Sequence, residues 1–293
     1  MTSLVTHVGV MFANGARAAE PEHAVELARA AEAAGYESQW AVQHVVMPVD
    51  HVSRYPYSTE GTVPGGSQVA IPDPFVWLGF AASVTSTIRL ATGVVIAPQQ
   101  HALVLAKQAA TLDRLSRGRF MLGVGAGWLR EEFDALDVSF DGRGALLDEQ
   151  IDVLRAAWTQ PIVAHTGPRM SFSGLAVEPK PVQAAIPIVV GGHTTAAVRR
   201  AGRTGDGFFP LAARGVDLAR LVGAMREVAI SHGRDASAVE VTADAPRTVD
   251  EATVIHQLGV DRVVINAPDV PTEALGEALH AKLDAVHELL AKG

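Results

Sequence analysis

Apolar residues along the chain alternate between short unbroken runs and longer stretches with helical spacing. Most of the short runs are apolar at successive positions, which is typical of strands buried on both faces of a parallel sheet. We therefore predict eight strands, at residues 5–12, 36–43, 88–97, 119–125, 187–192, 206–211, 239–243 and 261–267.

The stretches between these runs predict one main helix after each strand. The first has Pro21 where a helix begins, Gly35 where it ends, and an apolar stripe between them. A short helical piece is expected at 130–136. The main helices are predicted at residues 21–34, 73–85, 102–116, 144–158, 194–203, 216–232, 249–258 and 275–290.

Strict alternation of strands and helices predicts a parallel sheet, and eight units are the number that closes a (β/α)8 TIM barrel. We expect a single domain over residues 1–293, with a long loop at 44–72 and an inserted hairpin and loop at 161–187. A doubly wound open sheet is the alternative. It fits less well because no glycine-rich phosphate turn follows the first strand.

Gly93 lies in the middle of the predicted third strand, where a glycine normally weakens strand pairing. An interior glycine of this kind marks either a bend in the barrel or a position where a ligand or another backbone segment comes close. The sequence alone leaves both interpretations open. Pro98 ends the run because it has no N–H to donate to a neighbouring strand.

Composition narrows the class of protein. Hydrophobic residues make up 48% of the chain and charged residues 19%, as in ordinary soluble proteins. The absence of cysteine excludes disulfides, thiolate metal sites and cysteine nucleophiles. A formal net charge of −8 disfavours nucleic-acid binding, which needs a basic face. With neither a membrane-spanning run nor a signal-peptide pattern, we expect a cytoplasmic protein with no membrane partner.

In a barrel of this type, chemistry takes place at the carboxyl ends of the strands. Residues 191–195, Gly-Gly-His-Thr-Thr, leave an apolar run and open a predicted helix. Unpaired N–H groups at a helix start attract phosphate, and glycines allow its close approach. The alternative is a plain N-cap after a flexible turn. Other candidates at strand ends are Asn14, His44, residues 98–101, Gly125, Gly127, Trp128 and Phe209.

Two further motifs are less specific. Gly123, Gly125 and Gly127 resemble a dinucleotide fingerprint, but Arg130 replaces its third glycine, so we predict that they leave room for a flat ligand. His44 directly follows the second strand and is the candidate general acid or base, with a structural role as the alternative. The chain has no His-Glu-x-x-His pattern, which would predict a metal site, and no Gly-x-Ser-x-Gly elbow, which would predict an esterase.

Six segments together resemble the luciferase-like monooxygenase superfamily, and within it the oxidoreductases that use the deazaflavin coenzyme F420. The resemblance implies a TIM barrel that holds F420, or alternatively FMN, with the ring over the third strand. It also implies a cis peptide bond between Gly93 and Val94, and a cofactor phosphate at Gly191, Gly192, His193 and Thr194. The segments are residues 40–48, 90–95, 107–116, 122–133, 189–192 and 205–207.

Other site residues are expected from the resemblance and from their places at strand ends. Further cofactor contacts are predicted at Gln43, Thr92, Gly93, Val94, Gly125 and Gly127. Substrate contacts are predicted at Phe12, Asn14, Trp128 and Phe209. His44 matches a catalytic acid or ring contact of family members, with Glu131 or Glu132 as the second candidate for moving a proton. Family members often have an acidic residue before this histidine, whereas Gln43 offers it no neighbouring carboxylate.

The leading hypothesis from the sequence is therefore an enzyme that transfers a hydride between reduced F420 and a small organic substrate. An FMN-dependent monooxygenase that uses oxygen and a separate reductase is the first alternative. A non-catalytic flavin-binding protein on the same barrel is the second, because a fold does not fix a function. A homodimer and a separate cofactor reductase remain open expectations.

Overall fold

The computed structural model describes residues 7–58, 60–63, 65–212 and 214–293. In this part of the chain eight strand positions form a closed parallel barrel, in which β3 pairs with both β2 and β5, as the TIM-barrel prediction requires. Val5 and Thr6 of the predicted first strand lie outside the described residues. The strands are β1 (His7–Met11), β2 (Ser38–Ala41), β3 (Arg89–Thr92) with β4 (Val95–Ile96), β5 (Phe120–Gly125), β8 (Ile188–Gly191), β9 (Gly207–Phe209), β10 (Glu240–Asp244) and β11 (Arg262–Asn266).

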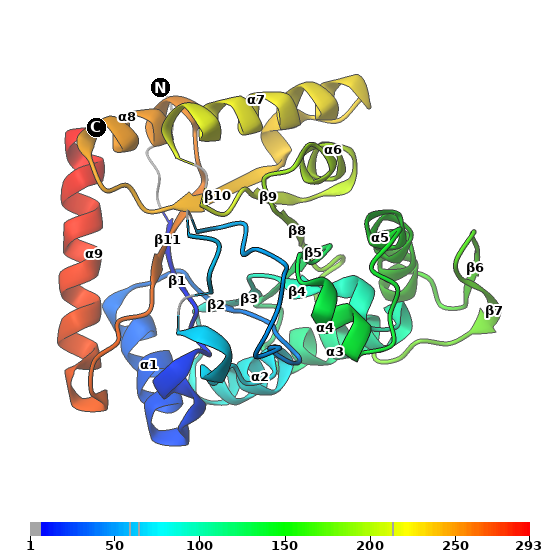
Figure 1. Cartoon of the computed structure of the whole chain (residues 1–293), viewed down its shortest axis with the longest axis horizontal. Helices are drawn as coiled ribbons and strands as arrows, with labels where there is room; N and C mark the ends of the chain where they lie inside the picture. The colour runs from blue at the N-terminus through cyan, green and yellow to red at the C-terminus, as the bar shows by residue number, and fades with distance from the viewer. Residues whose placement is uncertain (1–6, 59, 64, 213) are drawn as a thin grey trace.

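Helices surround the barrel on its outside (Figure 1). The longer helices bury apolar side chains in the core, as α9 does with leucines and a valine at helical spacing. No helix in the described ranges is both long and apolar enough to cross a bilayer. The helices are α1 (Pro21–Ala34), α2 (Pro74–Val84), α3 (Ala102–Leu115), the short α4 (Arg130–Ala135), α5 (Arg143–Thr159), α6 (Thr195–Thr204), α7 (Gly215–Ser231), α8 (Val249–Leu258) and α9 (Leu275–Lys292).

The predicted insertion after α5 contains an antiparallel hairpin, β6 (Val163–Thr166) and β7 (Ser171–Leu175). The hairpin projects from the barrel next to α5 (Figure 1). Glu149 of α5 holds it there, accepting hydrogen bonds from His165 Nε2 at 3.0 Å and from the amide of Met170 at 2.9 Å. The prediction of an inserted hairpin is therefore confirmed.

The third barrel strand is interrupted, whereas the sequence predicted one strand over 88–97. Pairing with β2 stops at Thr92, and pairing with β5 resumes at Val95. Between them, the peptide bond from Gly93 to Val94 is cis, as the resemblance implied. The interrupted pairing supports the bend interpretation of Gly93, and a Cβ there would lie 2.9 Å from the sulfur of Met11 inside the barrel.

The barrel interior changes from charged to aromatic along its axis. At the amino ends of the strands, Arg262 is 1% exposed and donates to both oxygens of Glu37, at 2.7 and 2.8 Å. Its guanidinium carbon lies 5.7 Å from the ring centre of Trp40. Trp40 in turn meets the edge of Phe209 at 5.5 Å between ring centres. Phe209 therefore separates this packed core from the space at the carboxyl ends.

Candidate active site at the barrel mouth

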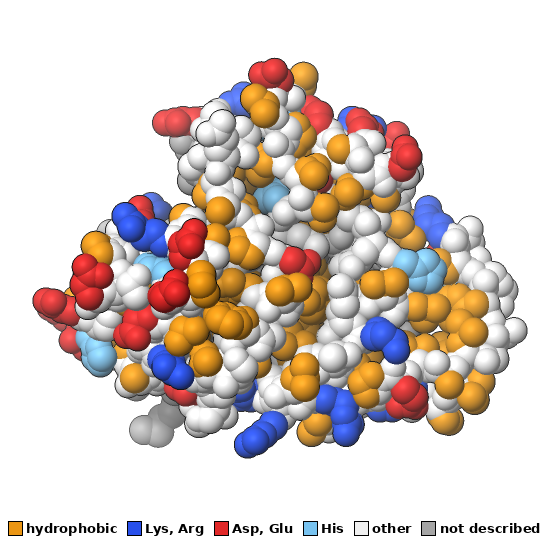
Figure 2. All heavy atoms as spheres, turned by 90° about the horizontal axis from the view of Figure 1, so that it is seen from below, with side chains coloured by type: hydrophobic (Ala, Val, Ile, Leu, Met, Phe, Trp, Pro, Cys, Tyr) orange, Lys and Arg blue, Asp and Glu red, His pale blue; other side chains and the backbone are white. Residues whose placement is uncertain are grey.

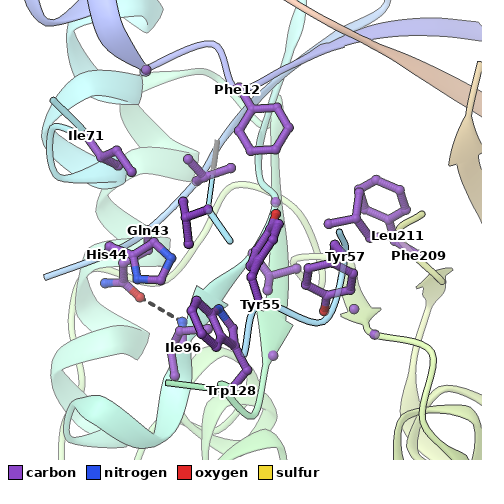
Figure 3. Close-up of a pocket in the computed structure, with 18 of the residues that line it drawn as sticks. Phe12, Gln43, His44, Tyr55, Tyr57, Ile71, Ile96, Trp128, Phe209 and Leu211 are labelled. Atoms are coloured by element: carbon purple, nitrogen blue, oxygen red, sulfur yellow. Dashed lines mark hydrogen bonds between the residues drawn. The ribbon is translucent and has the colours of Figure 1, made fainter. Parts of the chain in front are cut away.

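A cavity of about 720 Å³ opens at the carboxyl ends of the barrel strands. Its volume is within the range of sites that hold small molecules and cofactors. Figure 3 shows the residues around it, with aromatic rings on several sides. Thirteen residues predicted from the sequence line this cavity: Phe12, Gln43, His44, Gly93, Val94, Gly125, Gly127, Trp128, Gly191, Gly192, His193, Thr194 and Phe209.

Two predicted contact residues, Asn14 and Thr92, do not line the cavity. Both are completely buried. Asn14 braces the segment after β2, since its amide group bonds both N–H and C=O of Val42 at 2.8 and 2.9 Å. Thr92 donates its hydroxyl to the carbonyl of Gly123 at 2.8 Å, across the gap between β3 and β5. Their polar atoms thus satisfy the backbone, and a ligand contact is not supported for either.

The glycines of β5 and β8 make room for a side chain of the protein itself. A Cβ at Gly125 or at Gly191 would lie 2.7 Å from a methyl group of Val94, which is too close for any real contact. A Cβ at Gly123 would collide with the backbone carbonyl of Thr92. These glycines therefore leave space for the interrupted third strand to pack against β5 and β8. At Gly125 and Gly191 the side chain that fills this space is Val94, which lines the cavity.

His44 has a buried carboxylate partner that is 88 residues away in the sequence. Its Nδ1 lies 3.1 Å from Oε2 of Glu132, whose side chain is 1% exposed. The other oxygen of Glu132 accepts the amides of Val45 at 2.6 Å and Val46 at 3.4 Å. Burial acts to raise the pKa of Glu132, but the hydrogen bond and charge of His44, with the amide of Val45, outweigh it and lower this pKa.

Glu131, the other acidic candidate, has a different role. Its Oε1 accepts the amides of Val52 at 2.7 Å and Ser53 at 3.1 Å, which ties the long loop to the start of α4. Burial acts to raise its pKa, but hydrogen bonds from Ser53 and Val52 lower the pKa of Glu131 to about 2. We conclude that Glu131 anchors the loop as a permanent anion and is a poor proton donor.

Gln43 fixes the part of the cavity wall that β4 forms. Its side-chain oxygen accepts the amide of Ile96 at 2.7 Å, the hydrogen bond drawn in Figure 3. That amide belongs to β4, directly after the interruption of the third strand. Gln43 therefore holds β4 in place beside His44. An amide side chain at position 43 thus has a structural role in the cavity wall.

The long loop covers the cavity with aromatic residues that the sequence analysis missed. Tyr55 meets Trp128 edge-on at 5.4 Å between ring centres and Tyr57 at 5.3 Å, and Tyr57 meets His193 at 5.3 Å. Burial, and then the neighbouring Tyr55, raise the pKa of Tyr57 to about 12, so its hydroxyl stays neutral. In the sequence these tyrosines are part of a long loop without periodicity, and such a loop does not reveal which of its residues point inward.

The start of α6 has the features of an anion site. Gly192 has φ +111°, a conformation that glycine adopts readily and other residues rarely do. Thr194 is the N-cap, and its hydroxyl accepts the amide of Ala197 at 3.2 Å. The Gly-Gly-His-Thr segment thus lies at the cavity wall as a true helix start, and both predicted roles, phosphate contact and N-cap, remain compatible with it.

Charges around the cavity leave one guanidinium without an anionic partner. Of the arginines that line it, Arg17 and Arg200 each pair with an aspartate. Arg143 lies 3.5 Å from the ring centre of Phe140 and donates Nε to the carbonyl of Gly127, but it forms no ion pair with any described carboxylate. On a chain of net charge −8, this local excess of positive charge favours an anionic ligand.

In the ranges that the structure describes, no three histidine, aspartate or glutamate side chains are placed to hold a metal ion. Figure 2 shows a face of the molecule on which apolar side chains gather around the centre, while most charged side chains lie nearer the edge.

The chain is similar in sequence to a known protein family. Residues 1–269 match the family described as luciferase-like monooxygenase. An uncharacterized protein of Mycobacterium tuberculosis is 33% identical over 281 residues, which cover 94% of this chain and 98% of that protein.

Two solved structures share the fold. The coenzyme F420-dependent tetrahydromethanopterin reductase from Methanopyrus kandleri has a TM-score of 0.69 at 18% identity, and the alignment covers 94% of this chain and 97% of that one. The monooxygenase RslO1 from Streptomyces bottropensis has a TM-score of 0.65 at 24% identity, covering 97% and 83%. At these identities the likeness extends to the barrel and leaves the reaction open.

Proposed function

The chain belongs to the luciferase-like monooxygenase family, and we propose that it is an oxidoreductase that transfers a hydride between coenzyme F420 and a small organic substrate. One observation carries the proposal. A single cavity brings together a glycine-containing helix start, apolar and aromatic walls, and the buried pair of His44 and Glu132. This combination suits a ligand with a flat ring and a phosphate, next to a group that moves a proton.

The residues around the cavity fit such a cofactor. Gly192 and Thr194 at the start of α6 would hold the phosphate, with Arg143 as a nearby cation. Val94 and Gln43 also line the cavity, at the third strand and after the second, where the ring is expected. When bound, F420 supplies the hydride donor or acceptor, while the protein provides orientation and excludes water.

The chain's own contribution to the chemistry is the handling of a proton. Hydride transfer to a carbonyl carbon leaves its oxygen in need of a proton, and the reverse reaction releases one. His44 lines the cavity, and an imidazole is the side chain that most often serves as a general acid or base, so His44 would give or take this proton. Phe12, Val69 and Ile71 line another part of the cavity, where they favour a substrate with an apolar body.

Titration of the purified protein with F420 and with FMN, followed by fluorescence quenching, tests the cofactor. We expect micromolar or tighter binding of F420 and weaker binding of FMN. FMN binding ten times tighter than F420 would instead favour a monooxygenase that uses oxygen and a separate reductase. No change in the redox state of a bound cofactor with any substrate would favour a non-catalytic binding protein.

The phosphate site is tested first by changing the cofactor, which leaves the protein unaltered, and then by a substitution. We expect a deazaflavin that lacks the phosphate to bind roughly ten- to a hundredfold more weakly than F420, because a charge-assisted contact is worth about 1.5–3 kcal/mol. Gly192→Val should abolish that difference. Its circular dichroism and melting temperature are the necessary control, because φ at Gly192 is positive and any side chain there adds strain.

A further inference from the structure

We propose that Glu132 is a positioning residue that accepts the Nδ1 proton of His44 and so leaves Nε2 as the nitrogen that exchanges a proton with the substrate. The proposal deepens the proposed function and rests on it for the identity of the reaction. The arrangement of the pair itself rests only on contacts within the protein.

The direction of the hydrogen bond follows from the carboxylate. An ionised carboxylate accepts hydrogen bonds and donates none, so at 3.1 Å the hydrogen must be on Nδ1 of His44. Oε1 of Glu132 is already occupied by the amide of Val45, which leaves Oε2 for the ring. Within the described part of the chain Nε2 makes no hydrogen bond, and His44 lines the cavity.

The carboxylate holds both the ring and the backbone that follows it. Glu132 accepts the amides of Val45 and Val46 as well as Nδ1, so the side chain and main chain of this turn move together. Such a contact fixes both the tautomer and the orientation of an imidazole, and it stabilises the imidazolium when the ring gains a proton.

Other titratable groups near His44 are held by different partners. The ring of Trp128 lies edge-on to the imidazole at 6.0 Å between centres, and it separates His44 from His51 and Tyr55, which contact the same indole. Glu131 is bound to amides of the loop. Glu132 is thus the carboxylate in direct contact with this histidine.

The chain contains a second pair that serves as an internal control. His165 of the hairpin contacts Glu149 at 3.0 Å, but through Nε2. Glu149 also accepts backbone amides, is 7% exposed, and does not line the cavity. The same reasoning therefore predicts opposite tautomers in one molecule, with hydrogen on Nδ1 in His44 and on Nε2 in His165.

Long-range ¹H–¹⁵N NMR of the protein labelled with ¹⁵N-histidine decides the tautomers without any cofactor. Loss of signals in His44→Gln and in His165→Gln assigns the two rings. We expect a protonated Nδ1 and a bare Nε2 for neutral His44, and the reverse for His165. A His44 ring with its hydrogen on Nε2 would overturn the proposal.

Variants then test the effect on proton transfer. In Glu132→Gln we expect the preference for hydrogen on Nδ1 of His44 to weaken, because a neutral amide can donate a hydrogen bond to Nδ1 as well as accept one from it. Turnover with F420 should drop roughly ten- to a hundredfold with little change in KM, and its pH profile should change because the negative charge beside the imidazole is lost. Glu132→Asp keeps the charge and should recover part of the turnover, whereas Glu149→Gln should leave His44 and turnover as in the wild type.

The outcomes separate the two proposals. An unchanged His44 tautomer and unchanged turnover in Glu132→Gln would show that Glu132 does not position the histidine. A wild-type protein without hydride transfer to any cofactor would remove the proposed function, while the NMR result would still decide the arrangement of the pair. Because the tautomers are read in the wild type, the test does not depend on the folding of Glu132→Gln.

Discussion

The barrel buries a carboxylate at each of its ends, and the two carboxylates have different partners. At the amino ends of the strands, Glu37 receives two hydrogen bonds from the fully buried guanidinium of Arg262. At the carboxyl ends, Glu132 receives one from the imidazole of His44. Both carboxylates have a lowered pKa, because in each case the hydrogen bonds and charges around the carboxylate together outweigh the effect of burial.

The difference lies in whether the partner can change its charge. A guanidinium stays protonated at any pH at which the protein is folded, so Glu37 and Arg262 form a fixed pair that serves packing. An imidazole gains and loses a proton near neutral pH, and His44 lies on a cavity whereas Arg262 does not. We therefore expect changes at the amino end to affect stability and changes at the mouth to affect turnover.

The largest effect is expected for His44→Ala at the mouth. Removal of a general acid or base lowers turnover by roughly 10²–10⁴, while F420 affinity should stay near that of the wild type. Steady-state kinetics together with fluorescence titration measures both quantities. If F420 affinity collapsed and turnover at saturation were kept, His44 would be a binding residue.

The next effect is expected at the other end, for Arg262→Met. Removing Arg262 leaves Glu37, which is 16% exposed, with only Arg89 at 3.4 Å as a cation among the described residues, so we expect a cost near the lower end of the ~3–5 kcal/mol for breaking a fully buried pair. Urea denaturation measures the loss, and F420 affinity of the folded fraction should not change. Arg220→Met is the matched control, because Arg220 pairs with Asp217 on the surface and should cost less than about 0.5 kcal/mol.

The smallest effect is the acid dependence of stability. Burial acts to raise the pKa of Glu37, but the hydrogen bond and charge of Arg262 outweigh it and lower this pKa to about 2, from 4.5. A lowered native pKa means that the unfolded state binds the proton first, so this stability is full above about pH 4.5 and is lost as the pH falls toward 2.

We expect a loss of about 2 kcal/mol from this pair over that window, measured as the urea midpoint at a series of pH values. The double variant Glu37→Gln with Arg262→Met removes both charges and should show a flatter dependence. An equally steep dependence in the double variant would assign the acid sensitivity to other carboxylates, such as Glu32, whose pKa is also lowered to about 2.

The sequence by itself determined the barrel and most of the site. Burial on both faces makes parallel strands apolar at successive positions, so the eight strands could be predicted from local composition. Because chemistry in such a barrel lies at the carboxyl ends, the strand order then located His44, Trp128 and the Gly191–Thr194 segment. The cis peptide bond and the family were predicted from short motifs, which likewise consist of residues that are close together in the sequence.

Only the tertiary structure decided which groups meet. Glu132 and His44 are far apart in the sequence, and no local pattern states that α4 delivers a carboxylate to the end of β2. Likewise, the glycines of β5 and β8 were predicted to leave room for a ligand, and the structure shows that they accommodate Val94. Hydrophobic periodicity records whether a position is buried, whereas a side chain's partner depends on how separate elements pack, which is a property of the closed barrel alone.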